Sequence, residues 1–162
     1  MREELAAHRV LSYRLLWMDD RPPEEHPVLA LSAIATHDLP TVAGLWSGSD
    51  LRAQSELGLH PNIAAMEAGR ERLGKRAAVS EGASVEETIV GAHGALARAP
   101  SRLIAASLED ALGLERRPNM PGTVTEWPNW SIPLPTPLEN IVRHPLVDAV
   151  AAALSGKNEE RP

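Results

Sequence analysis

The chain of 162 residues has no cysteine, no phenylalanine and a single tyrosine. Without cysteine it cannot form disulfide bridges, thiolate nucleophiles or thiolate zinc sites, and this composition is typical of a reducing compartment. Aromatic residues make up only 3% of the chain, so a core must consist mainly of Leu, Ala, Val and Ile. No apolar run reaches about 18 residues, and we therefore expect no membrane span. The N-terminal MREELAAHRV lacks the apolar centre of a signal peptide, which predicts a cytoplasmic protein.

Clustered basic residues are also missing. The formal net charge is -6, and the 16 Lys and Arg residues are scattered, so we expect no nucleic-acid partner. The histidines at positions 8, 26, 60, 93 and 144 share no metal-ligand spacing, which predicts no metal site. No Gly-x-Ser-x-Gly elbow for a serine nucleophile occurs.

Three segments have the composition of strands, namely residues 10–18, 28–36 and 101–108. The middle one is a nearly continuous apolar run, which is typical of a strand buried on both faces of a parallel sheet. Helical patterns fill most of residues 50–99 and return near the C-terminus. This order predicts an α/β layer with parallel strands. Three strands would leave unpaired sheet edges, so the pattern is typical of part of a larger domain.

Several residues are candidates for helix ends. The predicted N-terminal caps are Asp50, Asn62, Ser84 (with Glu87 completing a capping box) and Thr136, which precedes Pro137. Gly156 is the expected end of the last helix, and residues 157–162 are expected to fray. The pair Glu109-Asp110 is expected to be a solvated strand end.

The middle strand ends at His37-Asp38 in the stretch SAIATHDLPTVAGLW. One interpretation is that Asp38 caps the helix that begins near Pro40. The other is that Asp38 lies at the mouth of a site, because catalytic residues of (β/α)8 barrels lie at the carboxyl ends of strands. The dipeptide alone leaves both open.

A second stretch, NMPGTVTEWPNW at residues 119–130, combines two tryptophans with two asparagines and a Pro-Gly turn. Indole faces stack on sugar rings and amides bond to hydroxyls, so this composition suits a carbohydrate site. The alternative is a turn whose tryptophans are buried against the last helix.

Taken together, THDLPTVAGLW and NMPGTVTEWPNW resemble the C-terminal part of the 4-α-glucanotransferases, also called amylomaltases or disproportionating enzymes. The stretch LEDALG lies between the two blocks, as in that family, and REELAAHRVLSYRLLWM resembles the segment after the family's acid/base glutamate. The resemblance weakens after Trp130. A plain α-amylase-type hydrolase is disfavoured because the second block belongs with the transferases.

The resemblance implies a (β/α)8 barrel that transfers α-1,4-glucan segments with retention, without a cofactor or a metal. Retention requires a carboxylate nucleophile and an acid/base carboxyl group. Asp38 would be the third carboxylate, which stabilises the transition state, and His37 would bond to the same sugar. Asn119 would border the glucan cleft, and Trp127 is the second substrate-binding residue expected from this block. The substrates would be malto-oligosaccharides or glucans of the starch and glycogen type.

The family's nucleophile and acid/base residues lie on its fourth and fifth strands, upstream of the segment that this chain resembles. A whole barrel takes about 250 residues, so we expect residues 1–156 to be the C-terminal portion of one, with strands six to eight, and residues 157–162 to be a tail. The expected protein is a transferase fragment, split-gene product or remnant that is inactive alone. In one version of this hypothesis, the chain complements a separate N-terminal polypeptide and the two together are active. The alternative is a non-catalytic glucan-binding or interaction protein.

Overall fold

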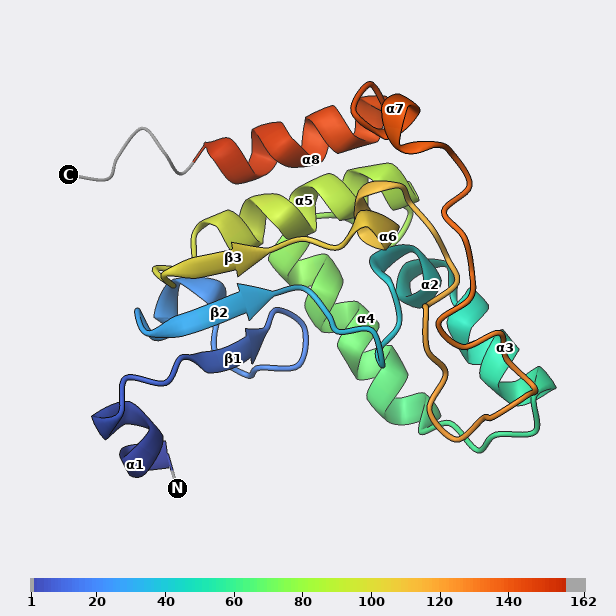
Figure 1. The fold of residues 1–162 in the computed structure, drawn as a ribbon, viewed down its shortest axis with the longest axis horizontal. Helices are drawn as coiled ribbons and strands as arrows, with labels where there is room; N and C mark the ends of the chain where they lie inside the picture. Colours follow the sequence, from blue (N-terminus) through green and yellow to red (C-terminus); the bar gives the residue numbers. More distant parts are fainter. Residues whose placement is uncertain (1, 157–162) are drawn as a thin grey trace.

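The computed structural model describes residues 2–156, and its centre is a three-stranded parallel sheet (Figure 1). The strands β1 (Ser12–Leu15), β2 (Ala30–Ala33) and β3 (Leu103–Ala105) lie in the order β1-β2-β3. The predicted parallel α/β layer is therefore confirmed. Each strand is shorter than its predicted segment, and β1 shows why: the N–H groups of Met18 and Asp19 both donate to the Leu15 carbonyl, which turns the chain out of the sheet.

The two faces of the sheet differ in what covers them. Tyr13 is paired with Leu31, and Leu31 with Leu103, so these three side chains share one face. Tyr13 and Leu103 are each 51% exposed, which leaves this face largely bare. On the other face Ser32 is fully buried, and Ile104 packs against the hydrophobic core.

Helices α4 (Ile63–Ala77), α5 (Val85–Ala97) and α8 (Pro145–Ser155) build the layer beside the sheet, and α8 lies along α5 (Figure 1). Asn62 caps α4 by accepting from the Ala65 N–H, and Ser84 and Glu87 form the predicted capping box of α5. The core joins residues from the strand ends with residues from these helices, such as Leu16, Ile34, Leu73, Ile89 and Leu96.

The remaining elements are short, and several lie beyond the carboxyl ends of the strands (Figure 1). They are α1 (Arg2–Ala7), the 3-10 helix η1 (Pro23–Glu25), α2 (Val42–Ser47), α3 (Ser49–Glu56), α6 (Leu108–Ala111) and α7 (Leu138–Ile141). The last helix ends at Gly156 as predicted. The predicted tail, residues 157–162, lies outside the described residues. No helix within residues 2–156 is long and apolar enough to cross a bilayer.

Three predictions about acidic and capping residues are wrong. Asp50 is not a cap, because α3 begins at Ser49 after a left-handed Gly48, and the Asp50 carboxylate is buried in an ion pair. Thr136 is not the cap of α7, whose N-cap is Pro137 and has no side-chain cap bond. Asp110 is not solvated, since it is 3% exposed.

Candidate functional site

The turn after β2 places His37 and Asp38 at the carboxyl end of the central strand. The Asp38 N–H donates to Thr36 Oγ1 at 3.3 Å, and the Leu39 N–H donates to the Thr36 carbonyl at 3.1 Å. The next helix, α2, is capped by Thr41, whose hydroxyl accepts from the Gly44 N–H at 3.0 Å. The interpretation of Asp38 as the helix cap is therefore wrong.

The Asp38 carboxylate is held from two sides and remains half exposed. Asn119 Nδ2 donates to Oδ1 at 2.6 Å, and His37 Nε2 lies 3.3 Å from Oδ2. The structure thus brings together three of the four predicted site residues. A carboxylate can accept about four hydrogen bonds, so this one retains acceptor positions for the hydroxyl groups of a ligand.

The main chain of Asp38 is fixed by Arg117. Arg117 Nη1 donates to the Asp38 carbonyl at 2.7 Å, and the same guanidinium forms a buried ion pair with Asp50. Burial raises the pKa of Asp50 and lowers the pKa of Arg117, and the charge of each partner opposes the shift in the other.

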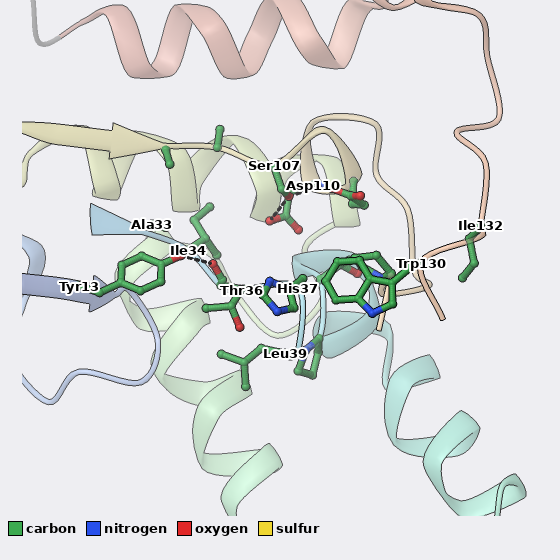
Figure 2. Close-up of a pocket in the computed structure, with 17 residues that line it drawn as sticks. Tyr13, Ala33, Ile34, Thr36, His37, Leu39, Ser107, Asp110, Trp130 and Ile132 are labelled. Atoms are coloured by element: carbon green, nitrogen blue, oxygen red, sulfur yellow. Dashed lines mark hydrogen bonds between the residues drawn. The ribbon is translucent and has the colours of Figure 1, made fainter. Parts of the chain in front are cut away.

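A pocket of about 460 Å³ opens beside this turn (Figure 2). Its volume is within the range of about 300–1,000 Å³ that ligand pockets usually have. The wall includes His37 from the turn, Tyr13 from β1, Trp130, and Asp110 from α6. Asp38 itself does not line the pocket. Its carboxylate adjoins the imidazole of His37, which does line the pocket.

Asp110 is a site residue that the sequence interpretation missed. Its carboxylate accepts from the Val42 N–H at 2.7 Å and from the Ser107 hydroxyl at 3.0 Å, which joins the start of α2 to the start of α6. Burial raises the pKa of Asp110, while these hydrogen bonds and the nearby His93 oppose the shift. The spacing Ser107-x-x-Asp110 was a usable signal, because a serine followed three residues later by an acidic residue is typical of a helix start.

The two tryptophans of the second block have different surroundings. Trp127 is 9% exposed, its Nε1–H donates to the Arg117 carbonyl at 3.1 Å, and the Arg116 guanidinium lies 4.6 Å from its ring centre. Its ring is buried and does not line the pocket, and its contacts are with Arg116 and Arg117 rather than with the last helix. Trp130 does line the pocket and is 66% exposed. The sequence interpretation chose Trp127, although the same stacking argument applied to Trp130.

No group of three or more His, Asp or Glu side chains within residues 2–156 is arranged to hold a metal ion. The arrangement offers an imidazole and an exposed indole in the wall of one pocket, with a half-exposed carboxylate beside the imidazole and an amide bonded to that carboxylate. Such groups bind hydroxyl-rich ligands through hydrogen bonds and ring stacking.

Comparisons with known proteins agree with this description. The chain is 36% identical over 159 residues to the 4-alpha-glucanotransferases of Mycobacterium bovis and Mycobacterium tuberculosis, covering 85% of this chain and 22% of each relative. It is 28% identical over 161 residues to that of Haemophilus influenzae, covering 85% of this chain and 23% of the relative. The crystal structure of amylomaltase from Corynebacterium glutamicum is similar with a TM-score of 0.80 and 28% identity, over 94% of this chain and 26% of that one.

The chain thus spans about a quarter of the length of these proteins. A family model described as 4-alpha-glucanotransferase matches residues 1–139, which is most of the chain, and we conclude that this chain belongs to the 4-alpha-glucanotransferase family.

Proposed function

We propose that the chain supplies one wall of the glucan cleft in a 4-α-glucanotransferase that transfers α-1,4-glucan segments between malto-oligosaccharides with retention. The observation that carries this proposal is the Asp38 carboxylate, which is held by Asn119 and His37 at the carboxyl end of β2 and remains half exposed. In parallel α/β folds, ligands bind at this end of the strands. The absence of cysteine is consistent with cytoplasmic action.

In this proposal Asp38 stabilises the transition state. Cleavage gives the sugar an oxocarbenium-like positive charge, which a fixed carboxylate nearby favours electrostatically. The same carboxylate accepts hydrogen bonds from sugar hydroxyls, and His37 bonds to the same sugar. The contact from Asn119 and the Arg117 bond to the main chain keep Asp38 in place before substrate arrives. The nucleophile and the acid/base carboxyl group are not assigned to any residue of this chain.

We further propose that β1, β2 and β3 are the sixth to eighth strands of a (β/α)8 barrel, with residues 1–156 as its C-terminal portion and residues 157–162 as a tail. The bare sheet face of Tyr13, Leu31 and Leu103 supports this, because the inner face of a barrel is filled by side chains from all its strands. The partner would be a separate N-terminal polypeptide that brings the nucleophile and the acid/base carboxyl group, which are assigned to no residue of this chain.

The test is glucan transfer from maltotriose. We expect no transfer by the 162-residue chain alone, and transfer when it is co-expressed with Corynebacterium glutamicum amylomaltase from which the matching quarter has been removed. Asp38→Asn in the reassembled enzyme should lower kcat by about a hundredfold or more, since a charge that acts in the transition state is lost. The matched control is Asp20→Asn, whose side chain is 92% exposed. Transfer by the chain alone, or unchanged kcat with Asp38→Asn, contradicts the proposal.

A second candidate is a non-catalytic glucan-binding protein. Two observations favour it. The polar site around Asp38 is intact, and neither the nucleophile nor the acid/base carboxyl group is assigned to a residue of this chain. Calorimetric titration of the chain with maltoheptaose should then give saturable binding that Asn119→Ala weakens, while no co-expressed polypeptide restores transfer. Restored transfer favours the enzyme.

A further inference from the structure

We propose that Trp130, and not Trp127, is the aromatic platform on which a glucosyl ring of the bound glucan stacks. This inference rests on the proposed function and names a binding residue for it. The first support is the difference in exposure: the Trp127 ring is buried and its N–H is bonded to a carbonyl, whereas Trp130 lines the pocket with two thirds of its surface open. Figure 2 shows Trp130 and Tyr13 on opposite sides of His37.

The second support is the backbone of Trp130. Its φ of 60° is in the left-handed region, which is a genuine outlier for a bulky residue and costs about 1–2 kcal/mol. Within residues 2–156 the other non-glycine residues with positive φ are Arg9 and Ala78, which follow α1 and α4, where a left-handed residue commonly ends a helix. Trp130 ends no helix, so its conformation needs another reason.

The structure around Trp130 holds this conformation firmly. Its N–H donates to the Pro118 carbonyl at 2.8 Å. The preceding Asn129 accepts from the Met120 N–H at 2.8 Å and donates to Thr123 Oγ1 at 2.9 Å. Residues that are strained and held by surrounding contacts are concentrated at ligand-binding positions.

The third support is where the strained backbone puts the ring. The Trp130 ring centre lies 4.8 Å from that of His37, with a tilt of 51° between the rings. His37 in turn adjoins the Asp38 carboxylate. An apolar π surface is thus placed next to an imidazole whose other neighbour is a carboxylate. A pyranose has the matching chemistry, because its faces present C–H groups to an indole while its rim presents hydroxyls to polar side chains.

The competing explanation is that Trp130 only packs on His37 and stabilises the turn. Trp130→Gly separates the two, because glycine removes the ring and adopts positive φ without strain. If Trp130 is a platform, the affinity for maltoheptaose falls at least about tenfold while Tm is unchanged or higher. If Trp130 is a packing element, Tm falls, and that result overturns the proposal. The matched control is Val124→Ala, which changes an 83% exposed side chain in the same segment outside the pocket.

The measurement is calorimetric titration of the 162-residue chain and its variants with maltoheptaose. A second readout is tryptophan emission, which should change on addition of maltoheptaose to the wild-type chain, with that change largely lost in Trp130→Phe. Wild-type binding with equal affinity in Trp130→Gly overturns this inference and leaves the proposed function standing. Absence of binding by the wild-type chain overturns the platform and the non-catalytic glucan-binding candidate, while the transfer assay of the reassembled enzyme decides the proposed function.

Discussion

Arg117 and Asp50 form an ion pair that is almost completely buried, with Nε 2.9 Å from Oδ1 and Nη2 2.9 Å from Oδ2. Their side chains are 6% and 2% exposed. The remaining nitrogen of the guanidinium, Nη1, donates to the carbonyl of Asp38. One charged pair therefore connects α3, the segment that carries Asn119 and the turn that carries the candidate transition-state stabiliser.

Removing one member of this pair should destabilise the fold strongly. Asp50→Ala leaves the Arg117 charge buried without its partner, and we expect the free energy of unfolding to fall by about 3–5 kcal/mol. Urea denaturation measures this change. Arg52→Ala is the matched control on the same helix, because Arg52 is exposed. A loss of less than about 1 kcal/mol in Asp50→Ala contradicts the prediction.

Asp110 should matter as a hydrogen-bond acceptor and not as a charge. Asp110→Asn keeps an acceptor for the Val42 N–H, whereas Asp110→Ala leaves this buried donor unsatisfied, at a cost of about 1–3 kcal/mol. The raised pKa means that the native state binds the Asp110 proton more tightly than the unfolded chain does. Its stabilising contribution is therefore present below the unfolded value of about 3.9 and is lost as pH rises through the native pKa.

Asp110→Asn lacks this loss, so its stability relative to the wild type should increase as pH rises from about 4 toward the native pKa. Chemical denaturation of the wild type and both variants across this pH range tests the prediction. Equal destabilisation by Asn and Ala would show that the carboxylate charge is what holds α2.

The parallel sheet and the caps at Asn62 and Ser84 could be predicted because their signals are local. A cap is recognised from residues within one turn, and a buried parallel strand from its own apolar run. Asp50 could not be interpreted in this way. An acidic residue at a helix start looks the same in sequence whether it caps the helix or pairs with an arginine 67 residues further along the chain.

The tryptophans show the same limit inside the candidate site. The family resemblance singled out Asp38, His37 and Asn119 as candidates, and the structure places these three side chains together. The sequence could not tell which tryptophan is exposed. That depends on the left-handed backbone at Trp130 and on the Pro118 carbonyl that receives its N–H, and neither feature has a signature in the motif.

Two glycines of α5 should respond in opposite ways to the same substitution. A Cβ at Gly91 would lie 2.4 Å from the Ala77 carbonyl oxygen at the end of α4, whereas a Cβ at Gly94 meets nothing within 4 Å. Gly91→Ala must push the helices apart, and we expect a loss of about 1–3 kcal/mol or more. Gly94→Ala should stabilise the chain by about 0.5–1 kcal/mol, because alanine loses less backbone entropy in a helix. Thermal or urea unfolding measures both, and a stabilising Gly91→Ala would contradict the observed approach of α4 to α5.

His26 should make the fold sensitive to acid. The imidazole is 2% exposed, and Nδ1 lies 2.8 Å from Ser32 Oγ, which lies 2.8 Å from Ser101 Oγ. Because the Ser101 hydroxyl donates to the Pro27 carbonyl at 3.1 Å, Ser32 donates to Ser101 and His26 Nδ1 donates to Ser32. The proton of the neutral ring is therefore on Nδ1, and Nε2 has no hydrogen-bond partner within residues 2–156.

Protonation of Nε2 would bury a second donor and a charge, and burial accordingly lowers the pKa of His26. A lowered native pKa means that the unfolded chain binds this proton first. The stabilising contribution is thus present above the unfolded value of about 6.5 and is lost as pH falls below it toward the native pKa, with a slope of at most about 1.4 kcal/mol per pH unit.

His26→Asn keeps a donor for Ser32 without a titrating group, so its free energy of unfolding should lack this decline. Denaturation series from pH 7.5 to about 5 compare it with the wild type and with His60→Asn, which changes an exposed histidine. A wild-type decline that persists unchanged in His26→Asn would place the acid sensitivity elsewhere in the molecule.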